Sequence, residues 1–138
     1  MENQKVIVYT QENGNAAVCY PTGELPIEQV QTKDTPEGSI IVNISDLPND
    51  YNEFFNAWEL SGSTVTVNKS KAVEITKKRL RVEREPLLQT QDILFQRALE
   101  TGADTTNIVA EKQRLRDITD LATTSLTLDQ LKNLSVTE

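Results

Sequence analysis

The sequence predicts an α+β protein in which a small β-rich unit, residues 1–68, precedes a helical region, residues 69–138. Two β-branched runs flank an Asn-Gly pair near the N-terminus, a pattern typical of a β-hairpin. From Ser70 onward the chain is an almost uninterrupted series of helix-forming residues. Charge divides similarly: residues 1–60 carry two basic and ten acidic side chains, whereas residues 61–138 carry twelve basic and eleven acidic.

The β-rich unit is expected to contain a hairpin, one or two further strands and a short helix. Strands over residues 5–10 and 16–20 enclose Asn13-Gly14, where we expect a primed turn with positive φ at both residues. A short helix is predicted to begin near Pro26, and a strand over residues 39–44. Four of the seven aromatic residues fall within 51–60, which predicts dense packing there. The alternating residues 64–67 are expected to close the sheet.

The second half of the chain predicts a helical hairpin over residues 87–121. Before this hairpin, Ser70 is placed to cap a helix that begins at residue 71. Pro86 should either kink that helix or begin a second one. Gly102 marks the stop, and Asp104 or Thr105 can cap a further helix through about residue 121. A last short helix after Thr127 has the spacing of a capping box.

Composition excludes several classes of function. Histidine is absent, which removes the commonest general base near neutral pH and the commonest transition-metal ligand. Cys19 is the single cysteine, and no glycine-rich phosphate cradle or calcium-binding loop occurs, so we expect neither an enzyme nor a cofactor. The net charge of −7 argues against nucleic-acid binding. The short apolar runs argue against a membrane span.

The remaining candidates for function are surfaces that bind other proteins. Val73, Leu80, Leu87 and Leu94 recur every seven residues, but the positions four further on are mostly polar, so they predict a narrow packing stripe rather than a two-stranded zipper. Beyond Pro86 the apolar stripe is broader than a two-helix hairpin can bury alone. The predicted interface residues are Leu87, Leu88, Leu94, Phe95, Leu99, Leu115 and Ile118.

A basic stretch around residues 77–84 is a second candidate. Its members are Lys77, Lys78, Arg81 and Arg84, which suit an acidic patch on a protein partner. The competing interpretation is a solvated helix face with charge pairs three and four residues apart, and the sequence favours it.

Several segments resemble small proteins encoded among the tail and tail-fibre genes of tailed bacteriophages. One is residues 54–59, Phe-Phe-Asn-Ala-Trp-Glu, at the end of the β-rich unit. The others lie in the helical region, at residues 71–72, 79–88, 95–100 and 111–118. The resemblance therefore spans most of the chain, and it rests on general pattern rather than on catalytic signatures.

The resemblance implies a structural protein of the virion tail, attached to a tail fibre or the baseplate and made in the host cytoplasm. The alternative is a fibre-assembly chaperone that is absent from the mature virion, and the apolar stripe over residues 87–121 favours the virion part. A regulatory protein-binding module, acting through the basic stretch, is a third reading that is independent of the resemblance. The expected partners are other tail or fibre proteins, with a homo-oligomer as an alternative and no nucleic acid, membrane or small-molecule substrate.

Overall fold

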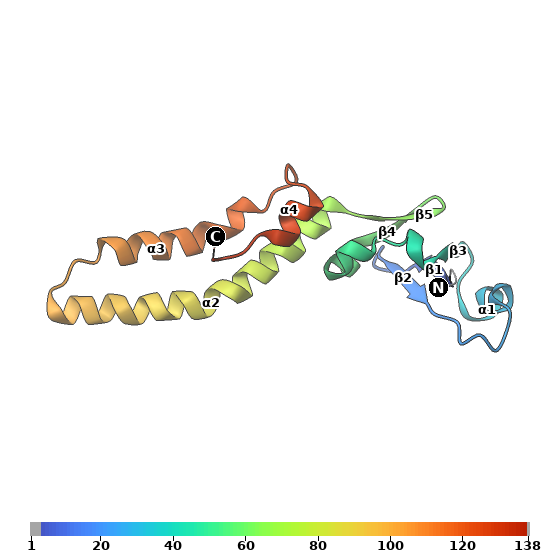
Figure 1. Ribbon diagram of the computed structural model, residues 1–138, viewed down its shortest axis with the longest axis horizontal. Coiled ribbons are helices and arrows are strands. Elements are labelled where there is room, and N and C mark those ends of the chain that lie inside the picture. Colours follow the sequence, from blue (N-terminus) through green and yellow to red (C-terminus); the bar gives the residue numbers. More distant parts are fainter. Residues whose placement is uncertain (1–3, 138) are drawn as a thin grey trace. The chain divides into compact units, whose positions relative to one another are not determined.

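The computed structural model describes residues 4–137 and confirms the predicted α+β fold class (Figure 1). Short antiparallel strands occupy the N-terminal part of the chain, and helices dominate the remainder. The chain divides into two compact units, Met1–Ala72 and Val73–Glu138. Each unit is described separately below.

The first unit is built on a three-stranded antiparallel sheet in the order β2-β1-β3. Its strands are β1 (Lys5–Thr10), β2 (Ala16–Cys19) and β3 (Ile40–Asn43). In the central strand, Ile7 lies opposite Cys19 on one side and Ile41 on the other. Helix α1 (Ile27–Asp34) begins after Pro26 as predicted and contacts β1 and β3.

The β1–β2 hairpin is confirmed, but its turn differs from the expected primed type. Within the described residues positive φ is confined to glycine, with Gly14 at +87°. The Gly14 N–H donates to the Gln11 carbonyl at 2.9 Å and the Gln11 N–H donates to the Asn15 carbonyl at 2.8 Å. This is a type I turn followed by a glycine bulge. The Asn13 side chain accepts the Asn15 N–H at 2.9 Å, which closes the loop without positive φ at Asn13.

A second, two-stranded sheet corrects the expectation that residues 64–67 close the first sheet. Strand β5 (Thr64–Val67) pairs antiparallel with β4 (Trp58–Ser61), a strand that the sequence reading missed. Gly62 at φ +63° is the first residue of their two-residue turn, the position that a type II′ turn reserves for glycine. The Gly62-Ser63 pair between two β-branched or aromatic runs was therefore an available hairpin signal.

Apolar residues between the two sheets form the core of the first unit. Val6 and Val8 of β1 pack in one buried cluster with Trp58 and Val65. The preceding 3₁₀ segments, η1 (Ile44–Asp46) and η2 (Asn49–Ala57), supply buried Phe54, and the Trp58 indole N–H donates to the Tyr51 carbonyl at 3.2 Å. The aromatic segment is thus packed as expected from its composition.

Helix α2 (Lys69–Thr101) contains Pro86 in its interior, so of the two outcomes predicted for this residue the kink is found and the start of a second helix is not. Figure 1 shows that α2 bends near its middle without a break. Proline leaves the carbonyl four residues earlier without its usual donor, and that residue, Val82, is 69% exposed, so water can hydrate the carbonyl. The predicted cap is also corrected: Asn68, not Ser70, accepts the Lys71 N–H, at 3.1 Å.

The second unit is a helical hairpin with a short C-terminal helix. After α2 come α3 (Thr106–Asp117), η3 (Ile118–Leu121) and α4 (Leu128–Asn133), and Figure 1 shows α3 running back alongside α2. Gly102 at φ +73° ends α2, and the Ala103 N–H donates to the Ala98 carbonyl at 2.8 Å as in a Schellman motif. The predicted capping box of Thr127 and Gln130 at α4 is present.

Candidate functional site

The turn of the helical hairpin is fixed by its own polar side chains. The Asp104 carboxylate accepts both the N–H and the hydroxyl of Thr106, at 3.0 and 2.6 Å, and these hydrogen bonds lower the pKa of Asp104. Of the two predicted cap residues, Asp104 and Thr105, it is therefore Asp104 whose side chain binds the first turn of α3. Together with Gly102 it orients the two helices antiparallel.

Contacts between α2 and α3 hold the hairpin closed along its length. Lys112 forms an ion pair with Asp92 at 2.7 Å, and the same ammonium lies over the Phe95 ring, 5.0 Å from its centroid. Nearer to the C-terminal end of α3, Arg84 donates to the carbonyls of Leu115 and Arg116 at 3.3 and 2.8 Å. Arg84 thus adds donors to carbonyls in the last turn of α3, where the Leu115 carbonyl also accepts the Ile118 N–H.

The base of the hairpin has a third layer, supplied by the C-terminal segment. Arg79 of α2 donates to the carbonyls of Leu131 and Leu134 at 3.0 and 2.7 Å, which ties α4 to the first half of α2. Fully buried side chains gather in this part of the unit: Leu80, Leu115, Ile118, Ala122 and Leu131.

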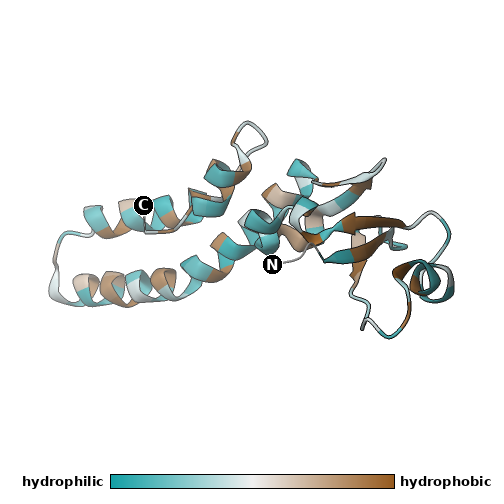
Figure 2. Cartoon of the chain, turned by 45° about the vertical axis from the view of Figure 1, so that its right-hand side comes forward, coloured by the Kyte–Doolittle hydropathy of each residue, from teal (hydrophilic) through white to brown (hydrophobic). Residues whose placement is uncertain are grey.

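The distal hairpin, which we define as residues 86–112, is packed much more thinly. Ala98 is the one residue of this segment that is buried. Large apolar side chains remain accessible, with Ile93 at 53%, Leu94 at 40%, Leu99 at 61% and Val109 at 48% exposure. Figure 2 shows hydrophobic positions recurring among polar ones along both helices. A two-helix hairpin without a third layer cannot bury more of them.

The predicted interface residues divide between these two regions. Leu94 and Leu99 are exposed, and Leu87, Leu88 and Phe95 are half-buried in the distal hairpin. Leu115 and Ile118 are instead in the core, at 0% and 2% exposure, so their assignment to an interface is corrected. Leu115 lies on α3 and Ile118 begins η3, and the sequence alone cannot tell an internal contact from an external one at these positions. Ile93 was missed because it was not assigned to the broadened apolar stripe after Pro86.

The predicted basic face is largely engaged within the chain. Arg84 binds the end of α3, and Lys77 lies 4.0 Å from Glu74, three residues earlier. Lys78 and Arg81 are exposed. Arg79 also pairs with Glu83 at 3.1 Å, four residues later. These two ion pairs have the spacing of three and four residues on which the solvated-face interpretation was based.

A second polar cluster lies in the first unit, around Glu59. Its carboxylate contacts the Lys71 ammonium at 2.6 Å and the Asn68 amide at 3.1 Å. Lys71 also donates to the Asn15 side chain at 2.8 Å, in the β1–β2 turn. The hydrogen bond from Lys71, followed by that from Asn68, lowers the pKa of Glu59. Every charged group of the cluster has an internal partner, so the cluster is structural in character.

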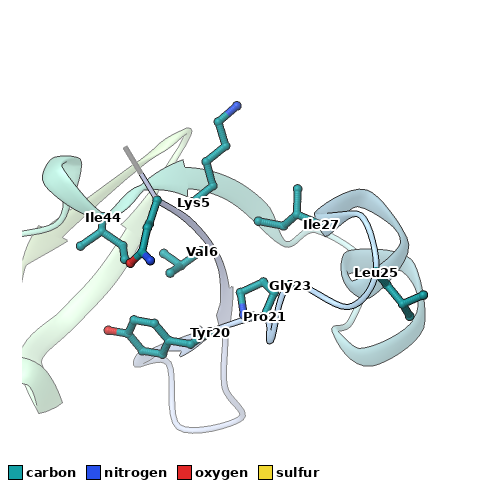
Figure 3. Close-up of a pocket in the computed structure, with 9 residues that line it drawn as sticks. Lys5, Val6, Tyr20, Pro21, Gly23, Leu25, Ile27 and Ile44 are labelled. Carbon is teal, nitrogen blue, oxygen red and sulfur yellow. The ribbon is translucent and has the colours of Figure 1, made fainter. Parts of the chain in front are cut away.

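A hollow of about 360 Å³ lies at the start of β1 (Figure 3). Its lining mixes polar and apolar groups, with Val6, Tyr20, Pro21 and Ile44 among them, and Lys5 is its one charged side chain. It presents no carboxylate or thiol for acid–base or nucleophilic chemistry. Within residues 4–137, no group of three or more Cys, Asp or Glu side chains is arranged to hold a metal ion.

No protein-family model, curated protein or solved structure matches this chain. None of the helices in the described part of the chain is long and apolar enough to cross a membrane. The strongest candidate site is the distal hairpin, because Ile93, Leu94, Leu99 and Val109 are exposed there.

Proposed function

We propose that this chain is a structural protein of a bacteriophage tail, attached to a tail-fibre or baseplate protein through the distal hairpin. The observation that carries the proposal is the thin packing of residues 86–112, where Leu94 and Leu99 remain exposed, whereas Leu80 nearer to the base of the same helix is completely buried. Large apolar side chains that stay exposed together in one segment are typical of surfaces that bind another protein. The sequence resemblance to tail-associated proteins supplies the kind of partner.

Binding of this kind also suits the chemistry of the site. The distal hairpin carries apolar side chains with Asp92 and Lys112 already paired to each other, so a partner would not have to neutralise these two charges. A largely apolar contact favours a lasting assembly over a transient one. The proposed location is the virion tail.

The first test is quantitative mass spectrometry of purified particles of the source phage. We expect peptides of this chain at a fixed ratio to the major tail proteins. Detection in infected-cell lysate but not in particles would overturn the structural role and favour an assembly chaperone. Reversible, salt-sensitive association through Lys78 and Arg81 would favour the regulatory reading instead.

The second test asks whether the distal hairpin makes the contact. Leu94→Asp with Leu99→Asp places two charges in the proposed interface, and loss of a buried anchor of this kind typically costs about 2 kcal/mol or more of binding. We expect the variant chain to be missing from particles produced in a phage that carries it. Phe95 is left unchanged because its ring contacts Lys112 inside the hairpin.

The matched control is Gln96→Asp with Asn107→Asp, which adds the same two charges at exposed polar positions of the distal hairpin. This control should enter particles normally. Circular dichroism of both purified variants should show the helix content of the unmodified chain. Normal incorporation of the Leu94→Asp, Leu99→Asp chain would refute the assignment of the interface.

A further inference from the structure

The outer edge of β3 carries backbone groups that the sheet does not use. The Ile44 N–H donates to the Gln4 carbonyl at 2.8 Å, which continues the β1–β3 register in which Val6 pairs with Val42 and Val8 with Ile40. In an antiparallel ladder, hydrogen-bonded pairs alternate with pairs that make no hydrogen bonds to each other. Ile40, Val42 and Ile44 therefore bond to β1, and the N–H and C=O groups of Ile41 and Asn43 point away from it.

This edge lacks the usual protection against pairing with another strand. Residues 39–44, Ser-Ile-Ile-Val-Asn-Ile, include no charged residue and no proline, the two devices that most often block an open edge. All four residues of β3 are only half-buried, although β1 beside them is almost completely buried at Val6, Ile7 and Val8. Residues 40–43 are the extended part of this edge, and Ile44 begins η1.

The pattern along β3 is complementary to itself. If a second β3 is placed antiparallel with a two-fold axis at Val42, Ile41 of each copy faces Asn43 of the other. The outward N–H and C=O groups of these two residues then bond to each other across the axis. On the core-facing side, Val42 meets Val42 and Ile40 meets Ile44, so that every cross-strand pair on that face joins β-branched side chains. Ile40, Val42 and Ile44 already pack against the core of their own unit.

We propose that two copies of this chain associate through β3, forming one continuous antiparallel sheet in the order β2-β1-β3-β3-β1-β2. The occupant of the edge is a second copy because a single register satisfies the outward backbone groups of Ile41 and Asn43 and, on the core-facing side, pairs apolar with apolar side chains. Such a two-fold contact uses the same patch on both copies and is closed, so it ends at a dimer. The contact involves the first unit and is independent of the function of the distal hairpin.

The test begins with sedimentation equilibrium of the full chain over a range of concentrations, where we expect a monomer–dimer equilibrium. Ile41→Pro removes an N–H that the intramolecular ladder does not use, so the fold should survive while the dimer is lost. Ile41→Ala, which keeps the N–H, should still dimerise. A chain that is monomeric at every concentration, or a dimer that persists in Ile41→Pro, overturns the proposal.

A cysteine at the axis tests the register itself. In a Cys19→Ser background, Val42→Cys should form a disulfide-linked dimer under mild oxidation, because the two Val42 Cα atoms would lie about 4.5 Å apart. Asn43→Cys in the same background faces Ile41 of the other copy and should not form that disulfide. Equal cross-linking at the two positions, or none at Val42→Cys, contradicts the proposed pairing.

Discussion

At the scale of single residues, Glu59 joins three parts of the first unit. Its carboxylate binds Lys71 and Asn68, while Lys71 reaches the β1–β2 turn at Asn15 and Asn68 also caps α2. These bonds favour the ionised carboxylate, which is why the pKa of Glu59 is lowered. A single charged group therefore connects the second sheet, the turn and the start of the long helix.

The lowered pKa predicts how stability depends on pH. A carboxyl with a lower pKa in the folded state contributes stability that is fully present above its unfolded pKa and is lost as pH falls through its folded pKa. Glu59→Gln should therefore destabilise the chain at neutral pH, and its difference from the unmodified chain should shrink as pH falls below 4.5, the ordinary value for this group. Urea titration monitored by fluorescence of Trp58, the one tryptophan, measures this difference.

Exposed Glu24 provides the control, since Glu24→Gln removes the same charge from the unit without touching the Glu59 cluster. At neutral pH its stability should stay close to that of the unmodified chain, whereas that of Glu59→Gln should not. A Glu59→Gln difference that is equally large in acid and at neutral pH would contradict the assigned role of the carboxylate.

Arg79 and Arg84 show what sequence reasoning misses at the residue scale. The basic stretch predicted a solvated face or a binding face, and charge spacing revealed the Arg79–Glu83 pair. The carbonyls that the two guanidiniums bind lie 31 to 55 residues further along the chain, at the ends of α3 and α4. Such contacts depend on tertiary packing, and no local pattern encodes them.

At the scale of elements, the sequence predicted well where a local signal was unopposed. The Thr127 capping box, the Gly102 stop and the β1–β2 strands all follow from short-range rules. Of the two outcomes that the sequence allowed at Pro86, a kink or a second helix, the structure has a bent helix with Pro86 inside it, and the carbonyl that Pro86 leaves without a backbone donor belongs to exposed Val82. The β4–β5 hairpin was missed because aromatic residues before Gly62 suggested a packed segment rather than a strand.

The sequence predicted the candidate interface in part. Helical spacing identified an apolar stripe on each helix, and exposure places Leu94 and Leu99 of that set on the distal surface. The same spacing could not distinguish buried Leu115 and Ile118 from the exposed apolar residues of the distal hairpin. An apolar stripe that another segment of the chain covers and one that stays exposed have the same pattern in the sequence. Only the position of the C-terminal segment distinguishes them.

At the scale of the whole molecule, each unit has buried apolar side chains. Trp58, Val6 and Val65 belong to one packed cluster in the first unit, and Leu80, Leu115 and Leu131 are completely buried in the second. A core of its own is the property that lets a compact unit unfold separately from its neighbour. The two units should therefore respond independently to a substitution in one of them.

Leu131→Ala tests this independence, because Leu131 is completely buried in the second unit. Removing a buried leucine side chain costs roughly 2–5 kcal/mol. We expect the helical circular dichroism signal, which the second unit dominates, to be lost at a lower temperature or urea concentration. Trp58 fluorescence reports on the first unit and should keep its midpoint. If both signals shift together by the same amount, the chain unfolds as one cooperative body, and the long helix shared by the two units transmits the destabilisation from one core to the other.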